Sequence, residues 1–385
     1  MVQRMTPVLR KVYDVEDFAG STRDFLGNSL VSKLQAPFRA WYNPSVARQL
    51  RRAQRQKAFD FWQVHNVFPG LSPSVYFEAA RWGIPVIHFL HNYRLGCVNG
   101  LFLNHGSPCH RCLDGNFWPS FFTGCWRDSR LISGWAGLIL FSLRKYRLYE
   151  KMAGWIALSH HQKSLCVQMG IPESRIHIVP HFYTLKQDPP APCPQGDVLY
   201  LGRLSREKGV DLLLQAWSLV RANGRKLQIC GTGPEEDALR HLARSQGLTN
   251  VVFRGFMTGE DLEEVWRQTA FLVVPSIVPE TFGMVVLEAW ARHRACLSFR
   301  LGSLGELIED NKDGRLVSPG SIEALGSAIQ EMVDHPSGVE SMGHLGADKL
   351  NQNFSEKIWL SRMEKVYQDF APKGRAGTNA SIEVV

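Results

Sequence analysis

The chain has 385 residues, of which 44% are hydrophobic and 21% are charged, and its formal net charge is +8. This composition excludes disordered, fibrous and collagen-like proteins, and the length favours two domains. The basic excess favours anionic partners such as nucleotides or phospholipid headgroups.

The default expectation for this chain is the reducing cytoplasm. It contains no run of about 18 apolar residues, so no membrane-spanning helix is expected. Its first residues carry no apolar segment of the kind that a secretory signal needs. The eight cysteines are too sparse for a small disulfide scaffold.

Two segments of the first half combine basic and apolar residues. The segment from Pro37 to Lys57 is basic and has no acidic residue, and we expect a helix from Ala47 to Trp62. Its basic face is either simply solvated or attracted to an anionic membrane surface. Leu131 to Leu148, an apolar run followed by basic residues, either lies in a membrane interface or forms a buried helix. No nucleic-acid-binding motif accompanies the charge, so no nucleic-acid partner is expected.

A proline-rich segment separates two differently patterned halves. Before it, buried strands are expected at 85–90, 155–158 and 175–179, with a helix after Ser159. The segment from Asp188 to Pro194 contains four prolines, which exclude a helix or a central strand. We interpret it as a semi-rigid linker.

After the linker, short apolar runs alternate with helical stretches. Strands are expected at 198–201, 227–230, 251–253, 271–274 and 295–299, and helices at 210–221, 235–246 and 355–370. This alternation predicts a doubly wound α/β domain with ligands at the carboxyl ends of its strands. The tail from Pro372 to Val385 is expected to be disordered.

The loop from Leu201 to Gly209 carries the first motif, between a strand and a helix. Gly202 permits a sharp turn and a close backbone approach. The helix N-terminus after Gly209 offers free N–H groups to an anion. Arg203 and Lys208 can converge on a diphosphate, Arg by bidentate contact and Lys as a mobile charge. The alternative is an ordinary turn with solvated charges.

A second glycine pair, Gly231 and Gly233, also lies between a strand and a helix. These glycines could let a nucleotide approach the backbone, although a tight turn explains them equally well.

The third motif contains two carboxylates, Glu280 in a loop and Glu288 eight residues later on a helix that starts near Gly283. The two can face one site and accept hydrogen bonds from ribose or hexose hydroxyls. The amides of Gly283 and Met284 could cap a phosphate oxygen. The alternative is a helix with an acidic N-terminal region and a solvated glutamate.

In order and spacing, these motifs resemble those of glycosyltransferase family 4, the retaining sugar transferases of the GT-B fold. The likeness covers most of the chain, from Phe59 to Phe370. The residues from Gly202 to Gly209 match the family pattern G-R-x-x-x-E-K-G, and those from Glu280 to Glu288 match E-x7-E.

The resemblance implies a fold and a set of roles. It implies an α/β protein of two facing Rossmann-like domains with a cleft between them. Arg203 and Lys208 would hold the donor diphosphate, Glu288 the ribose hydroxyls, and Glu280 the transferred sugar. His91, which follows a strand, matches the family histidine near the donor sugar, where an imidazole could hydrogen-bond a hydroxyl. A structural histidine is the alternative.

The implied domains have the following bounds. They are an N-terminal acceptor-side domain at 1–187 with a four-cysteine insert at 97–125, a linker at 188–196, a nucleotide-sugar domain at 197–353, a helix at 354–371 that returns to the first domain, and a tail at 372–385.

The implied reaction transfers a hexose-type sugar from a nucleoside-diphosphate sugar to a glycan or lipid-linked glycan acceptor. The transition state would resemble an oxocarbenium ion, and basic residues would stabilise charge on the departing diphosphate. The chain contains no Asp-x-Asp motif, which favours a metal-independent reaction with no catalytic cofactor. Peripheral contact with the inner membrane surface is expected from the basic helix.

Four cysteines fall close together in a loop-like segment with a central C-x-x-C pair. They are Cys97, Cys109, Cys112 and Cys125. A structural zinc site, free or packed thiols, and disulfides are the three interpretations. The run from His91 to Leu95 with Cys97, Asn99 and Gly100 resembles a subset of family members that make exopolysaccharides. The other cysteines are scattered and expected to be structural.

The beginning of the chain differs from the family pattern, because no strand followed by a glycine-rich loop is found before Phe59. We expect the segment from Lys11 to Leu26 to be the family's second strand with its loop, and one βα unit to be missing. Two alternatives to the transferase remain: a nucleotide-sugar epimerase on the same fold, and a degenerate donor-binding protein without turnover.

Overall fold

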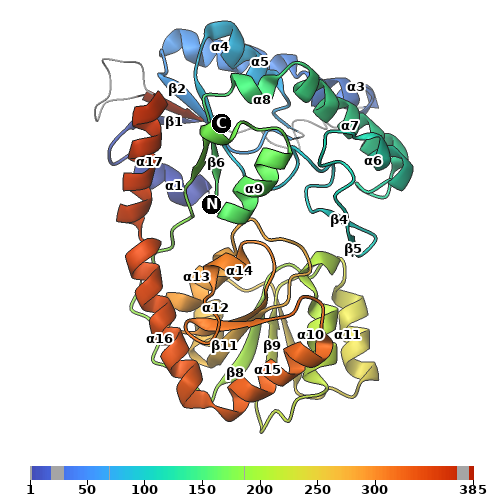
Figure 1. Cartoon of the computed structure of the whole chain (residues 1–385), viewed down its shortest axis with the longest axis vertical. Coiled ribbons are helices and arrows are strands. Elements are labelled where there is room, and N and C mark those ends of the chain that lie inside the picture. The colour runs from blue at the N-terminus through green and yellow to red at the C-terminus, as the bar shows by residue number, and fades with distance from the viewer. Residues whose placement is uncertain (1, 19–29, 69, 186, 371–380) are drawn as a thin grey trace. The chain divides into compact units, whose positions relative to one another are not determined.

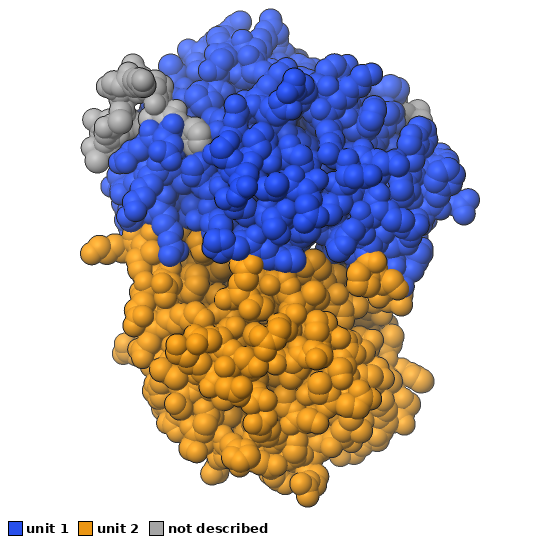
Figure 2. Space-filling view, viewed as in Figure 1, with its two compact units in different colours: residues 1–105, 109–179, 360–385 blue, residues 106–108, 180–359 orange. Residues whose placement is uncertain are grey.

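The computed structural model describes residues 2–18, 30–68, 70–185, 187–370 and 381–385, and the chain divides into two compact units (Figures 1 and 2). Unit 1 comprises Met1–His105, Cys109–Val179 and Leu360–Val385, and unit 2 comprises Gly106–Pro108 and Pro180–Trp359. Unit 2 therefore begins ahead of the proline-rich segment, earlier than the predicted boundary at 197. The segment from Asp188 to Pro194 lies outside helices and strands, as predicted.

Unit 1 is built on a six-stranded, all-parallel sheet in the order β1-β14-β2-β3-β6-β7. Its strands are β1 Asp14–Asp17, β2 Phe61–Val64, β3 Val86–Phe89, β6 Gly154–Ala157, β7 Ile176–Ile178 and β14 Ser381–Val384. Every residue of β2, β3 and β6 is buried, as expected for parallel strands covered on both faces.

Helices flank this sheet (Figure 1). They are α1 Val2–Leu9, α3 Leu30–Trp41, α4 Pro44–Gln56, α5 Ser74–Trp82, α6 Trp118–Thr123, α7 Arg130–Lys145, α8 Leu148–Lys151, α9 His160–Gln168 and part of α17 Glu356–Phe370. The Asn43 side chain caps α4 by accepting from the amides of Ser45 and Val46. The predicted helix at 47–62 is wrong at its end, because Phe61 and Trp62 belong to β2.

The strand β14 comes from the end of the chain and lies between β1 and β2 in the sheet. Ile382 pairs with Phe61 on one side and with Val15 on the other. Ile382 and Val384 are buried, so apolar side chains of the strand add to the core of unit 1. The prediction of a disordered tail is wrong for these residues, and the rest of that tail, 371–380, lies outside the described residues.

Unit 2 contains a second six-stranded parallel sheet, in the order β10-β9-β8-β11-β12-β13. Its strands are β8 Asp197–Leu201, β9 Leu227–Cys230, β10 Val251–Gly255, β11 Thr269–Val274, β12 Ala295–Phe299 and β13 Gly314–Val317. This is the doubly wound order, in which successive strands are added to one side of β8 and then, from β11 on, to its other side. The predicted α/β architecture is confirmed, although β13 was not foreseen.

Helices connect these strands and follow the last of them. They are the 3-10 turn η2 Arg206–Lys208, α10 Val210–Trp217, α11 Glu236–Ser245, α12 Gly259–Arg267, α13 Met284–Trp290, α14 Leu304–Leu307, α15 Ile322–Asp334 and α16 Pro336–Asn353. In doubly wound sheets, ligands bind at the carboxyl ends of the strands where the order reverses. The loops after β8 and β11 therefore lie where a ligand of this unit is expected.

None of the helices in the described part of the chain combines the length and the apolar content needed to cross a lipid bilayer.

Candidate functional site

The loops after β8 and β11 bring two predicted site residues into contact. The ammonium Nζ of Lys208 lies 2.5 Å from Oε1 of Glu280. The hydroxyl of Ser276 donates to the same carboxylate oxygen at 2.6 Å. Both partners of the ion pair are partly buried, so a cation and a carboxylate meet where the strand order reverses.

Further contacts fix the backbone around this pair. The Ser303 hydroxyl donates to the carbonyl of Glu280 at 2.7 Å, and the amide of Ile277 donates to the carbonyl of Glu207 at 3.0 Å. Gly209 has φ +64°, and a Cβ there would lie 2.1 Å from the carbonyl oxygen of Pro275. Only glycine allows these two loops to approach so closely.

Arg203 lies in the same loop as Lys208, with an exposed side chain. Its carbonyl accepts a hydrogen bond from the Tyr200 hydroxyl at 2.8 Å. Burial, and then the carboxylates of Glu280 and Glu207, raise the pKa of Tyr200. Tyr200 therefore remains a protonated donor that holds the backbone at the start of the loop.

Close packing against the backbone of a neighbouring loop explains why residues 231 and 233 are glycines. A Cβ on Gly231 would lie 1.8 Å from the carbonyl oxygen of Gly202, and one on Gly233 would lie 2.1 Å from that of Leu204. The amide of Gly202 also donates to the carbonyl of Cys230 at 3.0 Å. These glycines let the loop after β9 pack on the loop after β8, and their predicted nucleotide contact stays a prediction.

Glu288, the second carboxylate of the Glu280–Glu288 sequence motif, lies on α13, the helix that follows the Glu280 loop. Gly283 precedes α13 with φ +101°, and Met284 is its first residue. Glu288 is partly buried, and its carbonyl accepts from the Arg292 guanidinium at 2.8 Å. Its predicted ribose contact stays a prediction.

In unit 1, two histidines lie at the carboxyl ends of adjacent strands. His65 directly follows β2, and His91 follows β3. Nδ1 of His65 lies 2.7 Å from Nε2 of His91, and the two rings stack at a centroid distance of 5.0 Å. His91 was predicted as a site residue, whereas His65 was missed because it follows a strand assigned to a helix.

The histidine pair continues into a buried chain of hydrogen bonds. The Gln63 side-chain nitrogen lies 2.8 Å from Nε2 of His65, and the hydroxyl of Tyr367 donates to the Gln63 side-chain oxygen. Since an amide NH2 only donates, Nε2 of His65 accepts and Nδ1 of His65 carries the proton. Nε2 of His91 then accepts from His65, which places the proton of His91 on Nδ1.

Burial lowers the pKa of His91 to about 4. The imidazole is therefore neutral near pH 7, and it can act there as a hydrogen-bonding group rather than as a charge. His88, on β3 itself, is buried beside the hydroxyl of Tyr76, as predicted.

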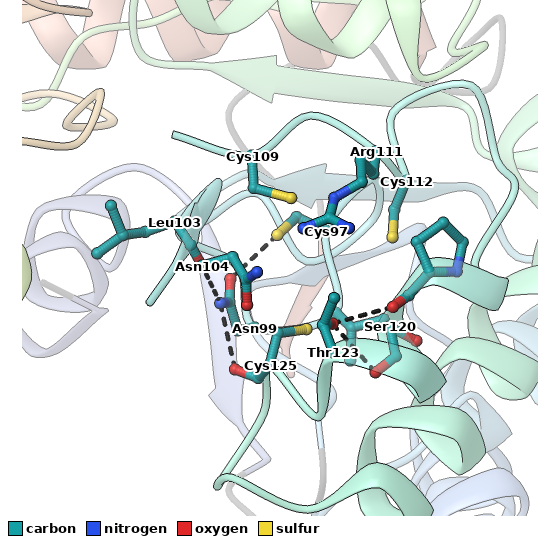
Figure 3. Close-up of a pocket in the computed structure, with 12 residues that line it drawn as sticks. Cys97, Asn99, Leu103, Asn104, Cys109, Arg111, Cys112, Ser120, Thr123 and Cys125 are labelled. Carbon is teal, nitrogen blue, oxygen red and sulfur yellow. Dashed lines mark hydrogen bonds between the residues drawn. The ribbon is translucent and has the colours of Figure 1, made fainter. Parts of the chain in front are cut away.

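The four clustered cysteines line one small cavity in unit 1 (Figure 3). All of them are free thiols, Cys97 and Cys112 buried and Cys109 and Cys125 half-buried. Burial, and then the neighbouring cysteines, raise the pKa of Cys112 to about 12. Within the described ranges, no three histidine, cysteine or carboxylate side chains are gathered closely enough to hold a metal ion as they stand.

Two family models match consecutive parts of the chain. "Glycosyl transferase 4-like domain" matches residues 18–181, and "Glycosyl transferases group 1" matches residues 195–335. The chain therefore belongs to the glycosyltransferases of the family 4 type.

Curated relatives match part of the chain. Alpha-D-kanosaminyltransferase of Streptomyces kanamyceticus is 31% identical over 175 residues, which are 45% of each chain. Glycogen synthase of Mycobacterium tuberculosis is 28% identical over 174 residues, 44% of this chain and 42% of the relative. The chain thus spans less than half of the length of these relatives.

Solved structures match more of the chain and define the fold as GT-B, with two Rossmann-like units. Anabaena HepE in complex with UDP has a TM-score of 0.66 at 16% identity, over 92% of this chain and 98% of that chain. The lipopolysaccharide outer core galactosyltransferase WaaB has a TM-score of 0.58 at 16% identity, over 84% of this chain and 79% of that chain.

Proposed function

We propose that the chain is a retaining glycosyltransferase that moves a hexose-type sugar from a nucleoside-diphosphate sugar to a glycan or lipid-linked glycan acceptor without a metal. The observation that carries this proposal is the Lys208–Glu280 pair, which joins the two loops at the strand reversal of unit 2. HepE, a protein of similar fold, was solved with UDP and with UDP-glucose, which supports a nucleotide-sugar donor.

The pair suggests how the donor binds. A diphosphate oxygen that approaches Lys208 competes with Glu280 for the ammonium group. Donor binding would then release the Glu280 carboxylate to accept a hydrogen bond from a sugar hydroxyl. Arg203 would add bidentate contact to the diphosphate, and Glu288 would accept from the ribose hydroxyls.

The transfer forms one C–O bond at the anomeric carbon, breaks another, and moves one proton. The acceptor hydroxyl oxygen bonds to the anomeric carbon, and the anomeric C–O bond breaks with its electron pair passing to the diphosphate. The acceptor proton passes to the departing diphosphate on the same face of the sugar, so the configuration is retained. Lys208 and Arg203 would stabilise the negative charge that grows there. Neutral His91 would donate from Nδ1 to a hydroxyl of the transferred sugar.

An exposed apolar surface on unit 1 supports an acceptor in a membrane. Leu131 of α7 is 78% exposed, Trp118 of α6 73% and Phe38 of α3 71%. On the opposite face of α7, Leu140 and Leu143 are buried. Apolar side chains therefore cover both faces of α7, and only one face is packed against the protein.

Contacts between the three helices make this one surface, which we call the α3–α6–α7 surface. The Trp135 indole of α7 donates to the carbonyl of Pro37 in α3 at 2.8 Å. The Ser120 hydroxyl of α6 donates to the carbonyl of Ser133 in α7 at 3.1 Å. The helices α3 and α7 contain basic residues, and none of the three helices contains an acidic one. An exposed apolar surface on helices that also carry basic residues suits an anionic lipid bilayer.

The membrane contact has a direct test. Flotation with vesicles of phosphatidylcholine and phosphatidylglycerol should carry the protein, and vesicles of phosphatidylcholine alone should carry less. Leu131→Ser combined with Phe122→Ser should abolish flotation, whereas Leu219→Ser, an exposed leucine of unit 2, should not. Equal flotation of all three proteins, or none with either vesicle, would overturn the membrane contact.

The donor proposal is tested by thermal shift with UDP, GDP, ADP and CDP, without added metal. At a ligand concentration about 100-fold above the dissociation constant, binding stabilises by about 2.7 kcal/mol. One nucleotide should raise the melting temperature, and Lys208→Ala should remove that shift. Lys312→Ala, at a surface Lys–Glu pair of the same unit, is the matched control. Absence of a shift with every nucleotide would overturn the donor site.

Turnover is then measured with the sugar form of the nucleotide that binds. Release of the nucleoside diphosphate in the presence of anionic vesicles with a glycolipid acceptor supports transfer. Isomerisation of the donor without an acceptor would instead identify an epimerase. Binding without any turnover would identify a donor-binding protein.

A further inference from the structure

We propose that Cys97, Cys109, Cys112 and Cys125 bind a single zinc ion, and that this ion fastens the loop after β3 to the α6–α7 pair. The proposal is independent of the sugar-transfer function and rests on the cavity in Figure 3.

The first observation is convergence. The four cysteines come from three separate stretches of the chain, yet all line one cavity of about 20 Å³. Figure 3 shows their side chains arranged around it. A cavity of this size holds one water-sized body, which is the size of a metal ion and not of an organic ligand.

The second observation is the chemistry of the lining. Four thiols surround the space, and none of them is in a disulfide. Four cysteines are a complete ligand set for a tetrahedral structural zinc ion. Soft sulfur ligands exclude Mg²⁺ and Ca²⁺, which prefer oxygen. A complete ligand set leaves no open position, so such an ion would be structural and not catalytic.

The third observation is that the backbone already holds the cysteines in place. The amide of Cys97 donates to the carbonyl of Tyr93 at 2.9 Å, and the amide of Cys109 donates to the carbonyl of Phe102 at 2.7 Å. The Asn99 side-chain amide donates to the carbonyl of Cys125 at 3.3 Å. These bonds join the cysteine-bearing segments around the cavity before any ion binds.

Binding requires the sulfurs to move inward, since the side chains do not yet form a metal site. The Sγ of Cys97 now donates to the side-chain oxygen of Asn99 at 3.0 Å. A change of χ1 rotamer swings a cysteine sulfur around the Cα–Cβ bond while the backbone stays in place. Zinc binding would replace the thiol protons with the ion, and the Cys97–Asn99 bond would be lost.

The ion would have a structural purpose in this segment. Between β3 and α6 the described chain has only two short strands, β4 Leu103–Asn104 and β5 Ser107–Pro108. The rest of the segment is held by hydrogen-bonded turns, and a metal can add side-chain cross-links between them. The same segment begins directly after His91, so the ion would also steady the loop beside the histidine pair.

The experiment uses the full chain, expressed with zinc and purified without chelators. Elemental analysis should find one zinc per chain, and loss of the ion to a strong chelator should lower the melting temperature. Cys112→Ser should lower the zinc content to well under one per chain. Cys193→Ser, a free cysteine outside the cavity, should keep it.

A second readout does not depend on whether the variants fold. Cobalt exchanged into the wild-type protein should give the intense sulfur-to-cobalt charge-transfer absorption of a tetrahedral thiolate site. Wild-type protein that folds without metal and shows no such band with cobalt would overturn the proposal. Full zinc content in Cys112→Ser would overturn it as well, because the ion would then lie elsewhere.

Discussion

Nδ1 of His65 lies 2.7 Å from Nε2 of His91, and the two residues follow adjacent strands of the same parallel sheet. Because Gln63 donates to the other nitrogen of His65, the contact fixes the tautomers of both rings. His91 accepts at Nε2 and carries its proton on Nδ1. The pair therefore leaves His91 as a neutral hydrogen-bond donor, and His65 would position it for the proposed sugar contact.

Replacing His65 tests this role. His65→Phe keeps a ring that can stack on Phe89, as His65 does at a centroid distance of 4.7 Å, but removes the hydrogen bond to His91. One lost hydrogen bond is worth about 1 kcal/mol, so we expect turnover to fall about fivefold to tenfold. The nucleotide-induced thermal shift should be unchanged, since the donor residues are in unit 2.

A matched control for this variant is His344→Phe, which breaks a second histidine pair in unit 2, with 2.8 Å between Nδ1 of His293 and Nδ1 of His344. It should leave turnover unchanged. Unchanged turnover in His65→Phe itself would assign the histidine contact to packing alone.

The neutral state of His91 has a consequence for stability. Its pKa is lowered from 6.5 to about 4 by burial, so the unfolded chain binds a proton more readily than the folded one. The contribution of His91 to stability is complete above pH 6.5 and is lost as the pH falls towards 4, by about 3 kcal/mol.

The measurement is the difference in unfolding free energy between the wild type and His91→Asn, from denaturant titrations at several pH values. This difference should favour the wild type most near pH 7 and decline by pH 4. His91 has the ordinary histidine pKa if the difference does not change with pH.

The Lys208–Glu280 pair predicts opposite effects on binding and on turnover. Glu280→Gln removes the carboxylate that competes for Lys208. An exposed or half-buried ion pair is worth up to about 1 kcal/mol, so the affinity for the nucleoside diphosphate should rise up to about fivefold. Turnover should fall by about 100-fold or more, since the group proposed to contact the transferred sugar is lost.

Calorimetric titration with the nucleoside diphosphate checks the first effect, and product release checks the second. Glu309→Gln, at the surface pair with Lys312, should change neither. Weaker nucleotide binding in Glu280→Gln would mean that Glu280 supports the diphosphate site and does not compete with it.

The strand β14 offers a stability test. The Ile382 side chain is completely buried, and truncating a buried isoleucine to alanine costs about 2–5 kcal/mol. Ile382→Ala should therefore destabilise unit 1 and expose the end of the chain to a carboxypeptidase. Ser381→Ala, one residue earlier, is the control, because Ser381 bonds to Asp60 through its backbone amide. If the tail were disordered, neither variant would change the stability of unit 1 or its digestion by the carboxypeptidase.

The sequence predicts unit 2 better than unit 1 for a physical reason. Its strands are short apolar runs separated by polar helices, and Leu227–Cys230 and Ala295–Phe299 match the structure at both ends. In unit 1, only residues 57–60 separate the basic helix α4 from β2, so the expected helix runs on into Phe61 and Trp62. β14, Ser381–Val384, alternates polar and apolar residues and so forms no apolar run, and its sheet partners lie far away in the sequence.

The candidate site shows the same division. Lys208 and Glu280 are each recognisable beside a strand end, and the strand order places them together. The sequence does carry a signal for His65, which was missed. His65–Asn66 and His91–Asn92 are both His-Asn pairs that follow a largely apolar run. The proton positions along the chain from Tyr367 to His91 depend on side-chain contacts that no sequence pattern contains.

A buried carboxyl on β14 should give a pH dependence of the opposite sign to that of His91. Burial, and then the charge of Glu16, raise the pKa of Glu383 to about 7. Its Oε2 is buried without a hydrogen-bond partner in the described structure, so the neutral form suits this position. The folded chain holds its proton more tightly than the unfolded chain does.

The contribution of Glu383 is therefore complete below pH 4.5 and is lost as the pH rises through 7, by about 3 kcal/mol. Glu383→Gln stays neutral, so it should match the wild type at pH 4.5 and be more stable than the wild type by up to that amount at pH 8. Because His91 and Glu383 act in opposite directions, the wild-type pH profile alone can be flat, and the variants are needed to separate them. Equal stability of Glu383→Gln and the wild type at pH 8 would show that Glu383 ionises at its ordinary pKa and that β14 leaves it in contact with water.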